Sequence, residues 1–225
     1  MENKDIHTTE KIEEIRLNSL LSKVFEGEPI ASSQVWNSDL ILKRGHRYLI
    51  EAASGAGKSS LCAFIYGNRK DYLGNIFFNN RNIKDLTIGE WQKLRRENIA
   101  YLPQELMLFP EMSAIDNIRL KNNITECVDE KRIDDWLSMM GLEERRDFPV
   151  GKMSVGQQQR VAIIRAICQP FDFILLDEPV SHLDERNNRL AAGLIEDVAR
   201  ENGAAIISTS VGNPLLLSDA VTISL

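Results

Sequence analysis

The sequence has few of the features that mark secreted and membrane-spanning proteins. Its three cysteines (Cys62, Cys127 and Cys168) form no C-x-x-C pair, so we expect free thiols and a reducing compartment. No apolar run reaches the roughly 18 residues needed to span a bilayer, and residues 1–16 lack the apolar segment of a secretory signal. These absences predict a cytoplasmic chain that works at a membrane only through a partner that supplies the membrane part.

Positively charged residues and histidines are also scarce. The 27 Lys and Arg residues are outnumbered by 33 Asp and Glu residues, and the net charge of −6 argues against a broad nucleic-acid-binding surface. The only histidines are His7, His46 and His182. What the chain does contain is enough apolar material, 43% of 225 residues, for one domain of ordinary to large size.

The apolar pattern predicts an α/β fold, with strands and helices alternating and helices on both faces of the sheet. Residues 1–13 are polar and predict a loose arm or a short helix. Helices are expected at residues 58–67, 88–97 and 184–201 and through most of 113–168. Strands are expected at 15–21 (an edge strand), 40–52 (two strands bent at Gly45), 74–83 (a strand, a turn and a return), 98–104, 171–179, 204–210 and 220–225.

The segment 51–61, EAASGAGKSSL, is close to the phosphate-binding pattern G-x-x-x-x-G-K-[ST]. It matches at Gly57, Lys58 and Ser59 but has Ala52 where the first glycine should stand. Lys58 can reach the β- and γ-phosphates of a nucleotide, and the Ser59 hydroxyl can bind Mg²⁺. The extra methyl group of Ala52 costs little if its φ is negative. The alternative is a flexible turn with a solvated lysine.

The position of this segment between a strand and a helix favours the phosphate-binding interpretation. Backbone N–H groups there point into one concavity at the positive end of a helix, and small residues let phosphate oxygens come close. The predicted nucleotide contacts are Ser54, Gly55, Ala56, Gly57, Lys58, Ser59 and Ser60.

The strand FILLDEP (173–179) ends in two adjacent carboxylates. Ligands of open α/β sheets lie outside the carboxyl ends of the strands, so Asp177 and Glu178 fall where a bound nucleotide would be. Asp177 can hold Mg²⁺ through water, and Glu178 can orient or deprotonate an attacking water molecule. The alternative is an acidic cap on the following helix.

Five elements, in this order and spacing, resemble those of the ATP-binding cassette ATPases, the nucleotide-binding domains of ABC transporters. SGAGKSS resembles the Walker A loop, YLPQ (101–104) the Q-loop, MSVGQQQRVAIIRAI (153–167) the signature, FILLDEP the Walker B strand and SHLD (181–184) the D-loop. The resemblance covers about residues 15–225. It implies a single domain over 1–225, with a P-loop NTPase core, an antiparallel β subdomain and a helical subdomain inserted at about 105–168.

The resemblance also implies ATP and Mg²⁺ as ligands and a head-to-tail homodimer. Gln104 would sense Mg²⁺ and water, and Phe25 falls near the aromatic that stacks on adenine in the family. Ser154, Gly156 and Gln157 of the signature, and Asp184 of the D-loop, would contact nucleotide bound by the facing subunit. The alternatives are an amphipathic helix with an N-cap serine for residues 154–168, which these residues taken alone favour, a polar strand end for Gln104 and a core residue for Phe25.

Two departures from the family pattern bear on the reaction. Val155 replaces the first signature glycine, so its Cβ and methyl groups must fit beside the phosphate that the facing subunit binds. Ser210 stands where the family has a switch histidine, and it is a shorter, neutral donor. Loss of a charge-stabilising group of this kind costs on the order of 10²–10³ in rate. We therefore expect slow intrinsic ATP hydrolysis.

The segment ELMLFPEMSAIDNI (105–118) is rich in apolar residues beside the Q-loop, which suits both core packing and a docking groove for a partner helix. With WQKLRRENIAYLPQ (91–104), it is especially similar to cassettes of the lipoprotein-releasing, macrolide-export and cell-division type. The leading hypothesis is an ATPase on the inner face of the cell membrane that powers a separate permease docked near residues 104–118. Alternatives are an ATP-gated regulator, a DNA-repair or translation cassette and a P-loop kinase. The acidic charge, and the lack of a long coiled coil or a second cassette, argue against the DNA-repair or translation cassette. The GQQQR helix ahead of the DEP strand end argues against the P-loop kinase.

Overall fold

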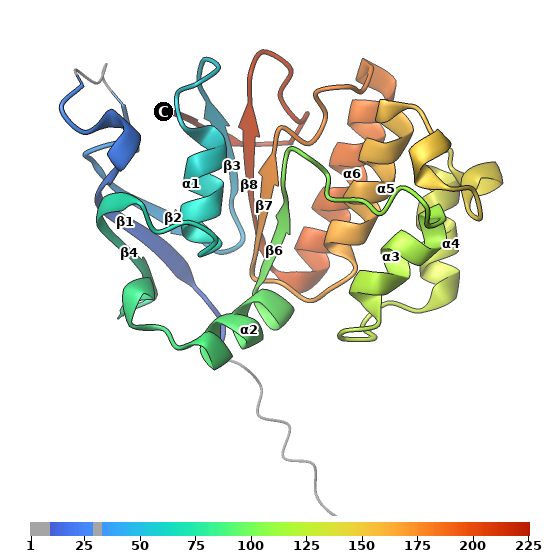
Figure 1. Ribbon diagram of the computed structural model, residues 1–225, viewed down its shortest axis with the longest axis horizontal. Helices are drawn as coiled ribbons and strands as arrows, with labels where there is room; N and C mark the ends of the chain where they lie inside the picture. The colour runs from blue at the N-terminus through green and yellow to red at the C-terminus, as the bar shows by residue number, and fades with distance from the viewer. Residues whose placement is uncertain (1–9, 29–32) are drawn as a thin grey trace, which may run out of the picture.

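The computed structural model describes residues 10–28 and 33–225, which form two sheets and a set of helices (Figure 1). The antiparallel sheet has the order β2-β1-β4-β5, and the parallel sheet the order β6-β7-β8-β3-β9. The strands are β1 (Glu14–Ser22), β2 (Asp39–Lys43), β3 (Arg47–Glu51), β4 (Tyr72–Phe78), β5 (Arg81–Asn82), β6 (Ile99–Leu102), β7 (Phe173–Asp177), β8 (Ala205–Ser210) and β9 (Val221–Ser224). The α-helices are α1 (Lys58–Ile65), α2 (Ile88–Glu97), α3 (Ala114–Asn122), α4 (Glu130–Met139), α5 (Val155–Ile167) and α6 (Glu185–Asn202). The predicted α/β fold with an antiparallel β part and an inserted helical part is confirmed.

The strand β7 lies between two separate hydrophobic cores. Ile174 and Leu176 face a core shared with the helices α3 to α6, which lie to the right in Figure 1. Phe173 and Leu175 face a core shared with α1 and the antiparallel sheet. All five residues of β7 are buried, which explains its unbroken apolar sequence, because helices or strands cover both faces of a parallel sheet.

The insertion between β6 and β7 contains α3, α4 and α5. Its helices begin at side-chain caps: Ser113 Oγ accepts from the Asp116 amide, Asp129 Oδ1 from the Arg132 amide and Ser154 Oγ from the Gln157 amide. The boundaries of the insertion, about 105–168, stay a prediction. Within residues 10–28 and 33–225, no helix is both long enough and apolar enough to cross a bilayer.

The predicted edge strand at 15–21 is wrong in its placement. This segment forms β1, which pairs with β2 on one side and β4 on the other. Its position in the interior of the sheet depends on partners that are distant in sequence, and a partly alternating pattern does not reveal them.

The loose arm predicted for residues 1–13 is not observed over residues 10–13. Ile12 is buried and its backbone N–H donates to Asp172 Oδ2 at 2.9 Å, while Asn98 Nδ2 donates to the carbonyl of Glu10 at 3.2 Å. A buried backbone N–H must find an acceptor, and the Asp172 carboxylate provides one here. The rest of the predicted arm, with His7, lies outside the described residues.

Candidate nucleotide site

The loop between β3 and α1 has the backbone that the phosphate-binding pattern requires. Gly55 and Gly57 have φ values of 82° and 96°, in the left-handed region that glycine enters without a Cβ clash. Ala52 is not among the described non-glycine residues with positive φ, so its methyl group adds no strain of this kind. The replacement of the first glycine is therefore compatible with the loop.

An aromatic pair supports this loop from behind. Trp36 is buried, and its indole Nε1 donates to the carbonyl of Ala56 at 3.0 Å. A Cβ atom added to Gly57 would lie 2.9 Å from Trp36 and 3.0 Å from Phe25. The two rings have centroids 6.0 Å apart. Phe25 thus lies against the loop, and its stacking on adenine stays a prediction. Trp36 is a supporting residue that the sequence reasoning missed.

Lys58 is the buried cation of the site. Its side chain is 4% exposed, and Nζ donates to the carbonyls of Ala52 and Ala53 at 3.1 and 2.9 Å. The same Nζ lies 3.8 Å from Oε1 of Glu178. A buried ammonium group held by two neutral carbonyls and one carboxylate is well placed to exchange these partners for phosphate oxygens.

The serines of the loop differ in their surroundings. Ser54 and Ser59 are exposed. Ser60 is half-buried, and its Oγ accepts a hydrogen bond of 2.7 Å from the Arg69 guanidinium, so this hydroxyl is already engaged on another side of α1. The predicted nucleotide contact of Ser60 stays a prediction.

The carboxyl end of β7 is organised by one hydroxyl group from β8. Thr209 Oγ1 donates to Oδ1 of the buried Asp177 at 2.8 Å and accepts from the backbone N–H of Glu178 at 3.2 Å. Glu178 has a φ of 50°, an uncommon conformation for a residue with a Cβ atom. This turn directs the side chains of the two adjacent acids apart, with Asp177 against β8 and Glu178 toward Lys58.

Glu178 also contacts the residue predicted to be the sensor glutamine. Gln104 Nε2 donates to Oε2 of Glu178 at 3.4 Å, and Lys58 Nζ lies near the other carboxylate oxygen. The three residues predicted to act in catalysis, which come from α1, the end of β6 and the end of β7, therefore meet at one carboxylate.

Gln159 of α5 connects the end of β7 to the loop that follows it. Its side chain is buried, and Nε2 donates to the carbonyl of Glu178 at 3.2 Å and to Ser181 Oγ at 3.1 Å. Its Oε1 accepts from the backbone N–H of His182 at 3.1 Å. The sequence reasoning missed Gln159, because one glutamine among three in succession gives no sign of which one faces inward.

The predicted signature residues lie at the first turn of α5. Ser154 and Gln157 form a reciprocal capping box, in which each side chain accepts from the backbone N–H of the other residue. Val155 is 50% exposed, and a Cβ atom on Gly156 would lie 3.0 Å from the carbonyl of His182. Within the described part of the chain, no hydrogen bond joins these residues to the loop 52–60.

Asp184 and Ser210 have different environments. Asp184 is the N-cap of α6, and the hydrogen bond from the Asn187 backbone N–H holds the pKa of its carboxyl group below the usual value. Ser210 is buried at the end of β8, where its carbonyl accepts from the Ala52 N–H at 3.5 Å. Its Oγ is buried and has no partner in the described residues. Such an unsatisfied hydroxyl is uncommon in a folded protein and adjoins the loop 52–60.

The thiol beneath the site is not a candidate nucleophile. Cys62 is fully buried in α1, and burial raises the pKa of its thiol well above the ordinary value, with the negative charge of Asp177 as a second cause. The thiol therefore stays protonated at neutral pH, and a protonated thiol is a poor nucleophile.

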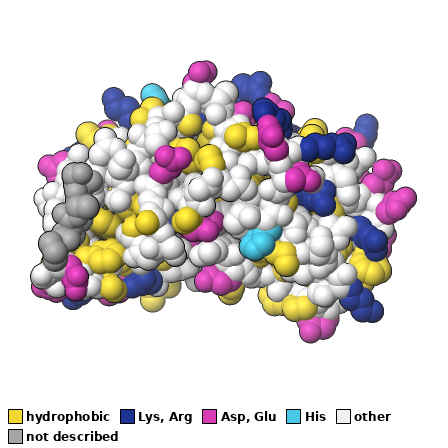
Figure 2. Space-filling model, turned by 90° about the horizontal axis from the view of Figure 1, so that it is seen from above, with side chains coloured by type: hydrophobic (Ala, Val, Ile, Leu, Met, Phe, Trp, Pro, Cys, Tyr) yellow, Lys and Arg dark blue, Asp and Glu magenta, His cyan; other side chains and the backbone are white. Residues whose placement is uncertain are grey.

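The face at the carboxyl ends of the parallel strands is shown from above in Figure 2. Backbone and uncharged polar side chains, drawn in white, occupy much of its middle, among scattered hydrophobic and acidic side chains, and Lys and Arg side chains lie mainly toward its edges. Lys58 is buried, so the positive charge of the site lies beneath the backbone of the loop and does not form part of an open basic patch. This arrangement suits a ligand whose phosphates contact the main chain.

Comparison with known proteins identifies the family to which this nucleotide-site geometry belongs. Residues 35–181 match the family model described as ABC transporter. The chain is 30% identical over 212 residues to the lipoprotein-releasing system ATP-binding protein LolD 1 of Caulobacter vibrioides, covering 88% of this chain and 90% of that protein. It is 32% identical over 177 residues to the macrolide export ATP-binding/permease protein MacB of Shewanella sp. (strain ANA-3), covering 76% of this chain but only 26% of that longer protein.

The structure is also similar to solved cassettes. The dimeric structure of the bacterial ABC transporter cassette MJ0796 has a TM-score of 0.77 at 27% identity and covers 93% of this chain and 94% of that one. A post-hydrolysis state of MJ0796 bound to ADP and Pi has a TM-score of 0.73 at 26% identity and covers 87% of each chain. The chain therefore belongs to the ABC transporter family, as an ATP-binding cassette.

The contacts of Thr209 predict that Thr209→Val destabilises the protein by about 1–3 kcal/mol, because the buried Asp177 carboxylate loses a hydrogen-bond donor while the shape is kept. Urea unfolding of Thr209→Val would measure this, with Thr222→Val as the matched control on the exposed side of β9. Equal unfolding midpoints for the two variants would contradict the structural role assigned to Thr209.

Proposed function

We propose that this chain is the ATP-binding and ATP-hydrolysing subunit of a transporter, and that it powers a separate membrane permease. The observation that carries the proposal is the convergence of Lys58 and Gln104 on the carboxylate of Glu178, at 3.8 and 3.4 Å. Relatives named as ATP-binding proteins of lipoprotein release and macrolide export support it.

The residues of the site fit a magnesium nucleotide. Gly55 and Gly57, with positive φ, have no Cβ atom that would keep a phosphate away from the backbone N–H groups of residues 54–60. Lys58 holds its ammonium group against the same loop. Ser59, Gln104 and Asp177 supply the oxygen donors that Mg²⁺ prefers. When bound, Mg²⁺ would neutralise charge that develops on the phosphates. Glu178 would accept a proton from the attacking water, with Gln104 orienting the same carboxylate.

We further propose a head-to-tail homodimer. Ser154, Gly156, Gln157 and Asp184 belong to the predicted site but are not hydrogen-bonded to the loop 52–60 of their own chain in the described residues. Helix α5 has an N-terminus that favours an anion, and a second subunit would bring it to the phosphates. The dimer reported for the MJ0796 cassette supports this arrangement.

The permease is proposed to dock near residues 104–118, which would hold the cassette at the inner face of the cell membrane. Met107 and Phe109 in this segment are 65% and 53% exposed, whereas Leu106 and Leu108 pack against the core. The segment thus both packs inward and presents apolar side chains outward, as expected for a docking surface.

Lys58→Ala is expected to weaken ATP binding by about ten- to a hundredfold, because it removes a charge-assisted contact to phosphate. Calorimetry of ATP with Mg²⁺ would measure the change, and Lys131→Ala on the exposed face of α4 is the control. If the unaltered chain releases no heat with ATP and Lys58→Ala changes nothing, the proposed function fails.

Steady-state ATPase assays are expected to show slow turnover of the isolated chain, because Ser210 cannot supply the charge of a histidine. Ser210→His should then raise kcat, by as much as about 10²-fold if the imidazole reaches the phosphate. Ser210→Ala tests the hydroxyl itself, and thermal unfolding checks that both variants fold at this buried position. Brisk hydrolysis by the unaltered chain would refute the prediction.

A second candidate function is an ATP-gated regulator whose turnover is incidental. The exposed Val155 at the start of α5 and the buried Ser210 both favour it, because each departs from the residue that the reaction uses in the family. Glu178→Gln should bind ATP, dimerise and lose hydrolysis. Cellular function retained by Glu178→Gln would establish the regulator, and cellular function lost with hydrolysis would establish the ATPase.

A further inference from the structure

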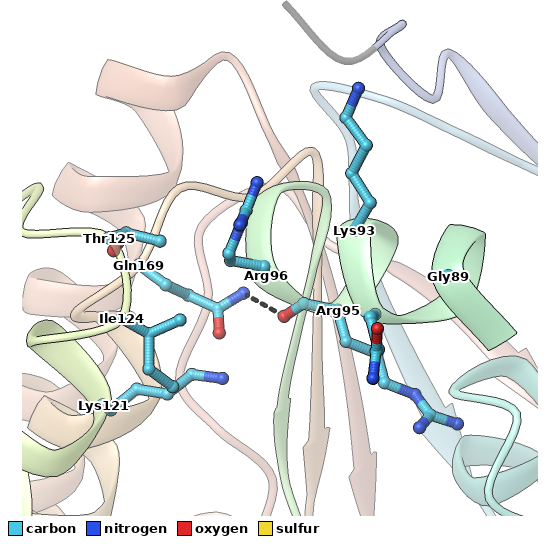
Figure 3. Close-up of a pocket in the computed structure, with 9 residues that line it drawn as sticks. Gly89, Lys93, Arg95, Arg96, Lys121, Ile124, Thr125 and Gln169 are labelled. Carbon is cyan, nitrogen blue, oxygen red and sulfur yellow. Dashed lines mark hydrogen bonds between the residues drawn. The ribbon is translucent and has the colours of Figure 1, made fainter.

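A cavity separate from the loop 52–60 lies between α2, the end of α3 and the chain that follows α5. Its volume is about 620 Å³, which is within the range of small-molecule sites. In Figure 3, Lys121, Ile124 and Gln169 lie together on one side of it, whereas Lys93 and Arg95 extend away from them. We call it the basic cavity, and it is lined by Gly89, Gln92, Lys93, Arg95, Arg96, Lys121, Ile124, Thr125 and Gln169.

The basic cavity is cationic in a protein whose net charge is −6. Four of the lining residues are Lys or Arg and none is Asp or Glu. Arg96 is paired with Glu97, and Arg95 donates to the carbonyl of Tyr66 at 3.2 Å. Lys93 and Lys121 form no ion pair with any described residue. The cavity therefore has positive charge that the described residues do not neutralise.

Lys121 is one of the two lining cations without an ion pair in the described residues. It is half-buried, and burial lowers the pKa of its ammonium group, with the positive charge of Arg165 as a second cause. Among the described residues, Arg165 donates to two backbone carbonyls, those of Leu106 and Met107, and to no carboxylate. An anion in the cavity would favour the charged ammonium group and so offset both the cost of its burial and the repulsion from Arg165.

Gln169 adds a second requirement. Its side chain is 2% exposed, and Nε2 donates to the carbonyls of Arg95, Ile99 and Pro170 at 3.2, 3.2 and 3.3 Å. These three acceptors fix the orientation of the amide, so Oε1 points the other way, into the space between Lys121 and the end of α2 (Figure 3). Oε1 has no partner in the described residues, and neither does the buried Oγ1 of Thr125. A buried acceptor of this kind requires a donor.

We propose that the basic cavity binds a phosphate ester that carries a free hydroxyl, of the glycerophosphate class. The phosphate oxygens would accept from Lys121, and the hydroxyl would donate to Gln169 Oε1, whereas the Lys93 side chain extends away from both residues (Figure 3). A carboxylate satisfies only half of these requirements, because an ionised carboxylate has no proton to donate. The group can come from a soluble glycerol phosphate or from the headgroup of phosphatidylglycerol. Ile124, which is 56% exposed on the lining, suits the second source.

The test uses the full chain with ADP and Mg²⁺ in excess, so that the loop 52–60 does not take up the probe. Calorimetry with glycerol 3-phosphate measures the soluble source, and sedimentation with phosphatidylglycerol vesicles, against phosphatidylcholine vesicles, measures the lipid source. Binding in either arm is expected to weaken about tenfold in Lys121→Gln, because one charge-assisted hydrogen bond is lost. Lys93→Gln on α2, whose side chain extends away from Gln169, and Lys131→Gln on α4 are controls that should leave it unchanged, and thermal unfolding checks that Lys121→Gln folds.

Several results would overturn the proposal. They are no binding in either arm, equal binding by all three variants, or tighter binding of a hexaglutamate peptide than of glycerol 3-phosphate. The same titration with Lys58→Ala separates this site from the nucleotide site. Probe binding that survives Lys58→Ala but is lost in Lys121→Gln supports the basic cavity whether or not the proposed ATPase function holds, and binding lost in Lys58→Ala assigns the probe to the loop and refutes the cavity.

Discussion

The parallel pairing of β6, β7, β8 and β3 is the constraint on which the site depends. The register places Leu102 beside Leu176, Asp177 beside Thr209 and Glu51 beside Ser210. All four strands therefore end at the same edge of the sheet, and the residues that follow them meet there although they are far apart in sequence. Because the strands are buried on both faces, a shift of register would expose apolar side chains.

Much of the fold could be predicted because its signals are local. The apolar run before Asp177 and the helices that end near Gly67 and Gly203 depend on neighbouring residues, and the structure has them within a few positions of the predicted bounds. The loop at Gly57 could also be predicted from the sequence, because a strand, small residues and a lysine follow one another directly. The interior position of β1 and the anchoring of Ile12 could not be predicted from the sequence, since both depend on partners distant in the chain.

The same distinction separates the parts of the site. Lys58, Gln104 and Glu178 were predicted from motifs, and the structure brings them together. Gln159 and Thr209 were missed because hydrogen bonds between elements, and not residue type, give them their roles. Ser60 shows the converse, since it has the predicted residue type and position, but the Arg69 guanidinium occupies its hydroxyl. The roles of these residues toward a nucleotide stay predictions.

The position of β7 between two hydrophobic cores has a consequence for how the cassette unfolds. Ile174 and Leu176 on one side, and Phe173 and Leu175 on the other, are side chains of a single extended segment. Sliding that segment by one residue would exchange the two sets and place phenylalanine where the helices accept aliphatic side chains. Neither core can therefore unfold without disturbing β7, which both cores share. We expect the helical part and the antiparallel sheet to unfold together in one cooperative step.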